Sequence, residues 1–245
     1  MPATRSLRGL RDAAMGRRWP SLCAACRGWG AGRVCADCRA RFAPVVPRCR
    51  RCALQLPAGV EICGDCVAAP PPFDAAFARV DYAYPWDRLI PAFKFHAALD
   101  LAPMLAEAIV EACTGRAADA GEPLILPVPL GEARLRERGF NQAWELARRL
   151  VPRLGGRAEP SLLLRLRDTP HQLALPPAER AGNVRGVFAV EPQRRGEIAG
   201  RTVAVVDDVM TTGSTAAEIA RTLRQAGAAR VEVWVVARTP RPADR

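Results

Sequence analysis

The chain has 245 residues and a mass of 26.5 kDa, which allows one or two domains at ~100–200 residues each. Its 49% hydrophobic and 25% charged residues are typical of a soluble globular protein and exclude wholesale disorder. The 36 basic and 25 acidic residues give a net charge of +11, and Lys94 is the only lysine. This basic excess favours polyanionic partners such as nucleic acids or phosphorylated substrates.

The first 22 residues predict a short basic helix. Leu7, Leu10, Ala14 and Met15 recur there at roughly helical spacing. The segment lacks the apolar core of a secretory signal, and no stretch of ~20 apolar residues predicts a membrane span. We therefore expect a cytoplasmic protein, and in that compartment paired cysteines bind metal more often than they form disulfides.

Residues 23–69 predict a double zinc ribbon. A C-x-x-C turn directs both sulfurs to one point, and two such turns make a tetrahedral four-sulfur site that favours zinc. Four ligands leave no position for water, so the two predicted zinc ions are structural rather than catalytic. Sequential pairing is the simplest assignment and interleaved pairing is the alternative, while an iron–sulfur cluster or redox-active dithiols are the rival chemistries. The eight predicted ligands are Cys23, Cys26, Cys35, Cys38, Cys49, Cys52, Cys63 and Cys66.

The composition changes near residue 70, where a proline-rich connector precedes a second domain at residues 73–240. Strand and helix patterns alternate in this domain, which predicts βαβ units and a doubly wound, mostly parallel α/β sheet. Cys113 lies on an apolar helical pattern, so we expect a buried thiol. The predicted strands are residues 77–84, 123–128, 202–206 and 230–237, and the predicted helices are residues 86–96, 99–113, 132–153 and 214–226.

The sharpest chemical signal is VAVVDDVMTTGSTAAE at residues 203–218. A buried strand ends in Asp207 and Asp208, at the edge where open α/β sheets bind ligands. Gly213 allows close approach of the backbone, and the following helix N-terminus suits a phosphate. Hydroxyls at 211–215 can donate to phosphate oxygens, and the carboxylates can accept from ribose hydroxyls or help to hold Mg²⁺. The alternative is a plain helix cap beside two solvated acids.

Residues 203–215 resemble the 5-phosphoribosyl-1-pyrophosphate (PRPP) motif of the type I phosphoribosyltransferases: an apolar strand, two acids, two further residues and T-T-G-S-T. The resemblance implies that Asp207 and Asp208 contact the ribose hydroxyls of PRPP, which binds with Mg²⁺. It also implies that the loop beyond these acids wraps the 5′-phosphate. The implied loop residues are Val209, Met210, Thr211, Thr212, Gly213, Ser214 and Thr215.

A narrower resemblance, to the ComF family, covers about residues 20–238. It rests on residues 126–147, residues 167–190 and the preceding cysteine pairs, with R-G-F-N-Q at 138–142 as a specific segment and Arg180 and Asn183 in an R-x-x-N signature. This family comprises competence-associated proteins linked to DNA uptake, with a zinc ribbon ahead of a phosphoribosyltransferase-like domain. The resemblance implies PRPP binding, a role in DNA uptake or utilisation, and single-stranded DNA and the uptake machinery as partners.

Three further features extend the predicted site. Pro127, Val128 and Pro129 end an apolar strand, and in the enzymes that this domain resembles the matching loop binds pyrophosphate; the alternative is a turn with two prolines. Lys94 matches a lysine of the ComF family, and one amine in an arginine-rich chain indicates a need for a compact charge. Residues 134–167 carry nine arginines against three acids. Arg138 is a candidate phosphate contact there, and a solvated face is the alternative.

Two functions remain open from the sequence. The first is a ComF-like protein that binds PRPP or phosphoribosyl groups and acts in DNA utilisation. The alternative is an active phosphoribosyltransferase that moves phosphoribose from PRPP to an unidentified nucleobase-like acceptor and releases pyrophosphate. Such a transfer needs phosphate placement and charge stabilisation more than a side-chain nucleophile. An aromatic content of 6% argues against an extended platform for stacking bases.

Overall fold

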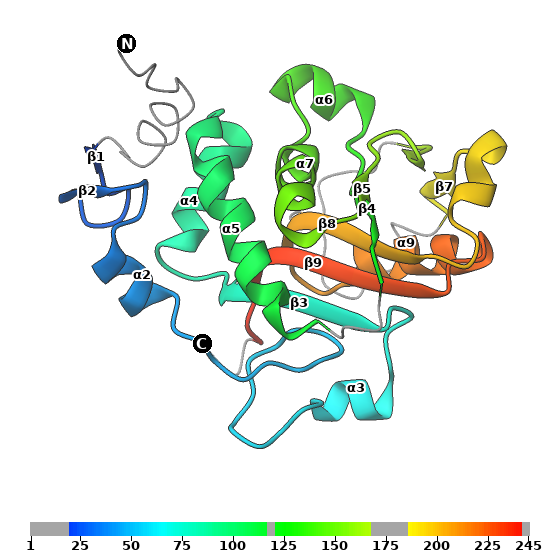
Figure 1. Cartoon of the computed structure of the whole chain (residues 1–245), viewed down its shortest axis with the longest axis horizontal. Coiled ribbons are helices and arrows are strands. Elements are labelled where there is room, and N and C mark those ends of the chain that lie inside the picture. The colour runs from blue at the N-terminus through cyan, green and yellow to red at the C-terminus, as the bar shows by residue number, and fades with distance from the viewer. Residues whose placement is uncertain (1–19, 117–120, 168–185, 242–245) are drawn as a thin grey trace, which may run out of the picture. The chain divides into compact units, whose positions relative to one another are not determined.

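The computed structural model describes residues 20–116, 121–167 and 186–241 (Figure 1). Most of the predicted N-terminal helix lies outside these residues, as do Arg180 and Asn183, and the last residues of that predicted helix instead form strand β1, Pro20–Leu22. The chain divides into two compact units, Met1–Pro44 and Val45–Arg245. The division falls between the second and third cysteine pairs, whereas the sequence groups all four pairs in one module.

The first unit is built around the first two cysteine pairs. Strand β1 pairs antiparallel with β2, Trp29–Ala31, and helix α2, Ala36–Phe42, follows. Cys23 and Cys38 are buried, while Trp29 is exposed. A unit with so little apolar surface to bury gains much of its folding free energy from a bound metal.

The second unit contains a five-stranded sheet in the order β3-β9-β8-β4-β5, and every strand pair in it is parallel. This confirms the predicted mostly parallel α/β sheet. A two-stranded antiparallel sheet, β6-β7, stands apart from it. The strands are β3 Ala75–Asp81, β4 Leu124–Pro127, β5 Arg157–Ala158, β6 Leu163–Arg165, β7 Phe188–Val190, β8 Thr202–Met210 and β9 Arg230–Arg238.

Helices cover both faces of this sheet (Figure 1). Helix α5 packs on β3 and β9, α7 packs on β4 and β8, and α9 contacts β8 and β9. Valines at alternate positions of β8 and β9 form one core with Ile219 and Leu223 of α9, as expected for strands whose side chains alternate between two buried faces. The helices are α3 Gly64–Ala68, α4 Trp86–Phe95, α5 Ala102–Ala112, α6 Glu132–Arg138, α7 Gln142–Leu154 and α9 Ser214–Gln225.

The structure corrects two predicted boundaries. Residues 132–153 are not one helix, because Gly139 adopts a left-handed conformation with φ of 78° and ends α6. Asn141 then caps α7 by accepting from the N–H groups of Ala143 and Trp144. Strand β8 runs past 206 to Met210, since its ladder with β9 continues to the pair Met210–Arg238. Cys113 is buried, as expected, and burial raises the pKa of its thiol.

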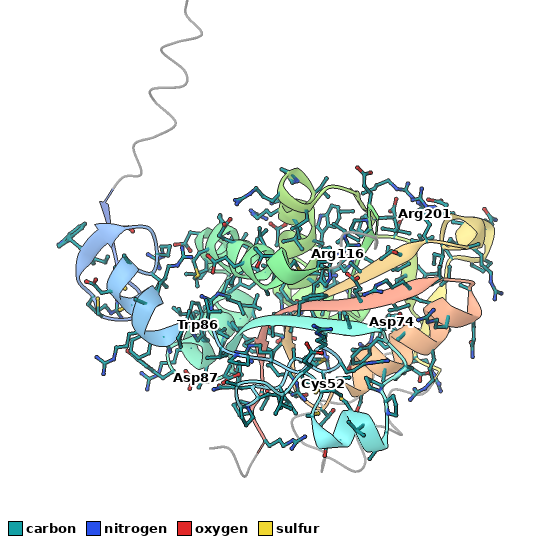
Figure 2. The ribbon with its side chains drawn as sticks, turned by 60° about the horizontal axis from the view of Figure 1, so that its bottom comes forward. Cys52, Asp74, Trp86, Asp87, Arg116 and Arg201 are labelled. Carbon is teal, nitrogen blue, oxygen red and sulfur yellow. The ribbon has the colours of Figure 1, made fainter. Side chains whose placement is uncertain are left out.

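The third and fourth cysteine pairs are joined to the sheet of the second unit. The backbone N–H of Ala76 donates to the Arg50 carbonyl at 3.1 Å, and Arg48 Nη1 lies 2.7 Å from Asp81 Oδ1 at the end of β3. Figure 2 shows Cys52 in the segment that runs below β3, beside α3. Within the described residues, no helix is both long and apolar enough to cross a membrane.

A buried ion cluster on β9 gives a stability prediction. Glu232 is 0% exposed and accepts from Arg116 Nε at 2.8 Å, Arg230 Nε at 2.8 Å and Trp234 Nε1 at 3.0 Å. Glu232→Ala removes the partner of these donors, so we expect the free energy of unfolding to fall by about 3 kcal/mol in urea denaturation. The control is Glu132→Gln, whose exposed pair with Arg136 spans 3.6 Å and should contribute under ~1 kcal/mol. Equal effects of the two substitutions would contradict the prediction.

Candidate functional site

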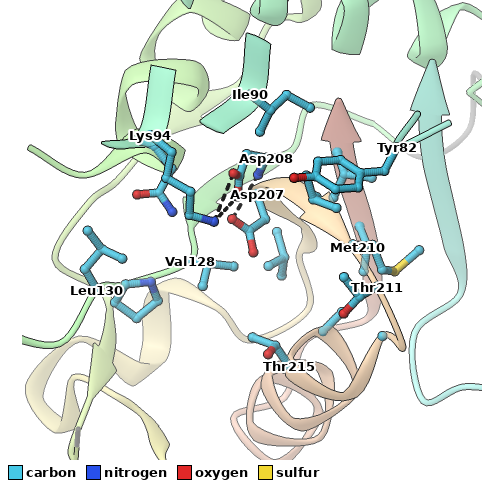
Figure 3. A pocket seen from close by; sticks show the side chains of 18 of the residues that line it. Tyr82, Ile90, Lys94, Val128, Leu130, Asp207, Asp208, Met210, Thr211 and Thr215 are labelled. Carbon is cyan, nitrogen blue, oxygen red and sulfur yellow. Dashed lines mark hydrogen bonds and ion pairs between the residues drawn. The ribbon is translucent and has the colours of Figure 1, made fainter. Parts of the chain in front are cut away.

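A pocket opens at the carboxyl ends of β8, β4 and β3 in the second unit (Figure 3). Its cavity volume is about 260 Å³, close to the lower end of the ~300–1,000 Å³ typical of small-molecule sites. Four cationic side chains, Lys94, Arg134, Arg138 and Arg165, and two acids, Asp207 and Asp208, are among the residues that line it. The excess of cations suits an anionic metabolite.

The two acids of β8 differ in their surroundings. Asp208 is 1% exposed, and Lys94 Nζ of α4 lies 3.0 Å from its Oδ2 and 3.2 Å from its Oδ1. Asp207 Oδ1 accepts the backbone N–H of Asp208 at 2.9 Å. Lys94 therefore neutralises Asp208. Asp207 lines the same pocket (Figure 3).

This arrangement separates the pKa values of the pair. Burial and the neighbouring Asp208 charge raise the pKa of Asp207 well above its usual value. Burial also opposes ionisation of Asp208, but the Lys94 ammonium and hydrogen bonds outweigh it and lower the pKa of that carboxyl. Burial disfavours the charged form of Lys94, yet the two acids raise its pKa overall. The Lys94 charge thus favours the ionised form of Asp208, whereas Asp207 holds its proton to a higher pH than a free aspartate does.

The turn between β8 and α9 is shaped for an anion. Gly213 adopts φ of 82° directly before α9, a left-handed conformation that side chains disfavour. Thr212 Oγ1 and Ser214 Oγ lie 2.9 Å apart, and the Ser214 N–H approaches Thr212 Oγ1 at 3.3 Å. Residues 211–215 line the pocket, so the helix N-terminus and several hydroxyls meet in one place, as phosphate binding requires.

The loop after β4 forms a second wall. The Val128 N–H donates to the Val206 carbonyl at 2.9 Å, which extends the ladder with β8. Asn141 Nδ2 donates to the Val128 carbonyl at 3.1 Å, so the residue that caps α7 also holds this loop. Val128, Pro129 and Leu130 line the pocket.

The R-G-F-N-Q segment brings a cation to the same wall. Phe140 stacks against Phe93 of α4 at 5.9 Å between ring centroids. Arg138 lies over the Phe95 ring at 5.1 Å and donates to Gln142 Oε1. Burial and the like charge of Arg134 lower the pKa of Arg138, although Asp208 opposes this shift. Each residue of the segment except the glycine therefore has a contact that orders the pocket wall, while Gly139 permits the turn.

Most of the residues predicted from the sequence to bind PRPP lie together in this pocket. All predicted PRPP-binding residues except Pro127 line this pocket, as do Lys94, Arg138, Asp207 and Asp208, and Pro127 is the last residue of β4. Arg134 and Arg138 face it together, since they lie four residues apart on α6, whereas Arg136 pairs with Glu132. The sequence analysis did not point to Tyr82, Ile90, Pro91 and Phe95, which also line the pocket. Tyr82 directly follows β3. Because ligands bind at the carboxyl ends of strands in open α/β sheets, this position could have indicated that Tyr82 lines the site.

The two cysteine clusters repeat one backbone design. The sulfurs group sequentially, Cys23, Cys26, Cys35 and Cys38 in one cluster and Cys49, Cys52, Cys63 and Cys66 in the other. In each, the first Sγ accepts an N–H at 3.3 Å from the third cysteine, and the residue after the second cysteine has a positive φ, 63° at Arg27 and 58° at Ala53. Burial opposes ionisation, but backbone N–H donors lower the pKa of Cys23 to about 6 and that of Cys49 to about 7.

Both clusters fit a zinc ion. The four sulfurs of each lie within 4.8 Å of one another. Zn–S bonds of ~2.3 Å in a tetrahedron place sulfurs ~3.8 Å apart. Cys26 and Cys35 Sγ are 3.8 Å apart, and Cys52 and Cys63 Sγ are 3.6 Å apart. The donor set and its spacing suit two structural four-sulfur sites, with N–H groups that stabilise the thiolates.

Metal analysis tests this assignment. We expect about two zinc ions per freshly purified chain, because each cluster supplies a complete tetrahedral set. Cys23→Ser/Cys26→Ser and Cys49→Ser/Cys52→Ser should each lower the content to about one, measured by mass spectrometry of the metal. Cys113→Ala is the matched control and should keep both ions. Iron in place of zinc, or one ion in the unsubstituted chain, would overturn the assignment.

A family model described as a phosphoribosyl transferase domain matches residues 167–245. Glutamine phosphoribosylpyrophosphate amidotransferase from B. subtilis, complexed with ADP and GMP, is a similar solved structure at 23% identity and a TM-score of 0.35, covering 54% of this chain and 25% of that chain.

Relatives match over nearly the whole chain. The DNA utilization protein YhgH of Salmonella typhi is 35% identical over 231 residues, which cover 90% of this chain and 98% of that protein. Competence protein F of Haemophilus influenzae is 32% identical over 214 residues, covering 84% of this chain and 90% of that protein. Because both relatives are more than 30% identical and match over most of this chain, the chain belongs to the ComF family.

Proposed function

We propose that the chain binds PRPP, or another phosphoribosyl group, in the pocket at the end of β8 and acts in the use of DNA. One observation carries the binding proposal. The buried Asp208, held by Lys94, shares a single pocket with the Thr211–Thr215 turn at the start of α9. A carboxylate pair for hydroxyls and a helix N-terminus for phosphate are the two recognition elements that a phosphorylated ribose needs.

The 5′-phosphate is assigned to residues 211–215. Backbone N–H groups at the N-terminus of α9 and the hydroxyls of Thr211, Thr212 and Ser214 supply donors, and the helix dipole favours the negative charge. Gly213 has no side chain that would fill the space above the turn. This part of the pocket recognises any phosphate monoester, so it does not by itself select a sugar.

The ribose is assigned to the two acids. Carboxylate oxygens accept hydrogen bonds from neighbouring hydroxyls, and two adjacent acids select a diol. Asp207 and Asp208 also offer oxygen ligands to the Mg²⁺ that accompanies a diphosphate. The diphosphate is assigned to the opposite wall, where Lys94, Arg138 and the loop of Val128 and Pro129 line the pocket. There the guanidinium supplies a planar set of donors and the ammonium a compact charge.

The role in DNA utilisation is taken from relatives. Proteins that match over most of this chain carry the names DNA utilization protein YhgH and Competence protein F. The net charge of +11 is compatible with a nucleic-acid partner. Transfer of phosphoribose to an acceptor is the second outcome of the experiment below, and Tyr82, Ile90 and Phe95 offer an apolar lining for a flat acceptor.

Calorimetric titration with PRPP and Mg²⁺ tests the binding proposal. We expect Asp207→Asn and Asp208→Asn each to weaken binding at least about tenfold, ~1.4 kcal/mol, because each removes a carboxylate that accepts from the ribose. Glu132→Gln, on an exposed part of α6, should bind as the unsubstituted chain does. Ribose 5-phosphate should bind more weakly than PRPP, because it lacks the diphosphate.

The titrations and a turnover assay distinguish the possible outcomes. Absence of heat with the unsubstituted chain, or equal affinities for all variants, would overturn PRPP binding. Release of pyrophosphate on addition of nucleobases would establish transfer, and its absence in the presence of tight binding would restrict the pocket to binding.

The raised pKa of Asp207 predicts a pH dependence. Below that pKa the free pocket holds a proton on Asp207, while hydroxyl donors and Mg²⁺ favour the ionised form. Below that pKa, binding should therefore release a proton and tighten as the pH rises, by at most about tenfold per pH unit. Titrations in buffers of different ionisation enthalpy measure the proton directly. Asp207→Asn should abolish that release, and proton uptake by the unsubstituted chain would contradict the prediction.

A further inference from the structure

Arg238 has no part in the binding scheme above, yet it is a buried charge at the end of β9. The strand is apolar from Val233 to Ala237 and then places this arginine, 8% exposed, beside the last residue of β8. A buried guanidinium needs hydrogen-bond partners for its donors. Arg238 Nη1 donates to the adjacent Thr239 carbonyl at 2.9 Å, and its other partners lie in two segments that are far apart in the sequence.

One set of partners begins the phosphate turn. Arg238 Nη1 donates to the Met210 carbonyl at 3.0 Å and also to the Thr211 carbonyl. The Thr239 N–H donates to the same Met210 carbonyl at 3.1 Å. A trans peptide is planar, with its N–H opposite its C=O. By holding these two carbonyls, Arg238 turns the N–H groups of Thr211 and Thr212 away from itself and sets the direction in which the chain leaves β8.

The other partner is a cysteine of the second cluster. Arg238 Nε donates to the Cys52 carbonyl at 2.9 Å. Cys52 belongs to the turn Cys49–Ala53, which is closed by the Ala53 N–H donating to the Cys49 carbonyl at 2.8 Å. One guanidinium therefore spans from a metal-ligand turn to the start of the phosphate turn.

Beyond Ala53, which packs in the main core, few hydrophobic side chains hold the metal-ligand turn. Leu54 and Leu56 are the hydrophobic residues that pack with the four cysteines of this cluster in the described structure. Arg48 Nη1 adds one contact, to the Ala53 carbonyl at 3.1 Å. A four-sulfur cluster with so small a core is ordered chiefly by its metal. Loss of the metal would release the Cys52 carbonyl and, with it, one of the bonds that hold Arg238.

We propose that Arg238 is a positioning residue that couples metal occupancy of the Cys49–Cys66 cluster to the phosphate-binding turn at residues 211–215. Zinc orders the Cys52 turn, the Cys52 carbonyl fixes Arg238, and Arg238 fixes the Met210 and Thr211 carbonyls. On its ligand side the inference rests on the proposed function. Coupling between two binding sites is reciprocal. PRPP must therefore strengthen zinc binding to this cluster by the same factor by which zinc strengthens PRPP binding.

Zinc release from the full chain tests the coupling. Cys23→Ser/Cys26→Ser removes the first site, so the remaining ion belongs to the second cluster. A colorimetric zinc chelator then competes for it with and without saturating PRPP and Mg²⁺. We expect PRPP to lower the equilibrium release of zinc about tenfold, within the ~5–150-fold typical of coupled sites.

Two arginines make a matched pair for this experiment. Arg238→Met should abolish the effect of PRPP on zinc release, and Arg238→Lys should recover only part of it, because one ammonium cannot span both turns. Arg241→Met should keep the full effect, since Arg241 Nη2 bonds Asp65 Oδ2 of the same cluster at 2.6 Å but lies outside the pocket lining. If Arg238→Met does not fold, the lysine variant answers the same question.

Hydrogen exchange of the amides at 210–215 gives a readout that needs no ligand. Removal of zinc should speed this exchange in the unsubstituted chain and in Arg241→Met, but not further in Arg238→Met. PRPP binding without any effect on zinc release would overturn the coupling and leave the proposed function standing. Absence of PRPP binding would overturn the proposed function. Amide exchange rates at 210–215 that do not change when zinc is removed would by themselves overturn the coupling.

Discussion

The buried carboxylate of Asp208 is the constraint on which the pocket depends. A charge that is 1% exposed needs a partner, because desolvation of an isolated ion costs several kcal/mol. Lys94 supplies it, and because Lys94 lies on α4, the ion pair fixes that helix against the end of β8. Phe93, the preceding residue of α4, then meets Phe140. The ion pair and this aromatic contact together bring the α6–α7 turn, and with it Arg138, to the pocket.

The same ion pair affects the pKa of Asp207. One lysine neutralises one carboxylate, while desolvation and the charge of that carboxylate raise the pKa of the second acid. A ligand that brings hydroxyl donors or a divalent cation favours the ionised form of Asp207 and so opposes this shift. Arginine in place of Lys94 would present a wider, planar group to the two Asp208 oxygens. In a cavity of about 260 Å³ a compact ammonium leaves more room for a diphosphate.

Local features of the site could be predicted from the sequence, and non-local ones could not. The acids and the turn at 211–215 lie on one strand–loop–helix, whose residues encode their own geometry. Lys94 reaches Asp208 across 114 positions, and although its being the only lysine and the resemblance to a family pointed to it, neither indicated its partner. The break at Gly139 was missed because the apolar period continues through it, although glycine is a common helix end. The spacing of the cysteines left their grouping open, and the structure resolves it as sequential.

The two cysteine clusters show how one residue changes the role of a repeated turn. Both turns need a left-handed residue after the second cysteine, and neither uses glycine. Arg27 holds that position in the first cluster and is exposed, whereas Ala53 in the second is 0% exposed and belongs to the main core. An arginine side chain could not occupy the space beneath the sheet, and a glycine would lose the methyl group that packs there. Ala53 thus lets the turn sit against the strands, which brings the Cys52 carbonyl within reach of Arg238.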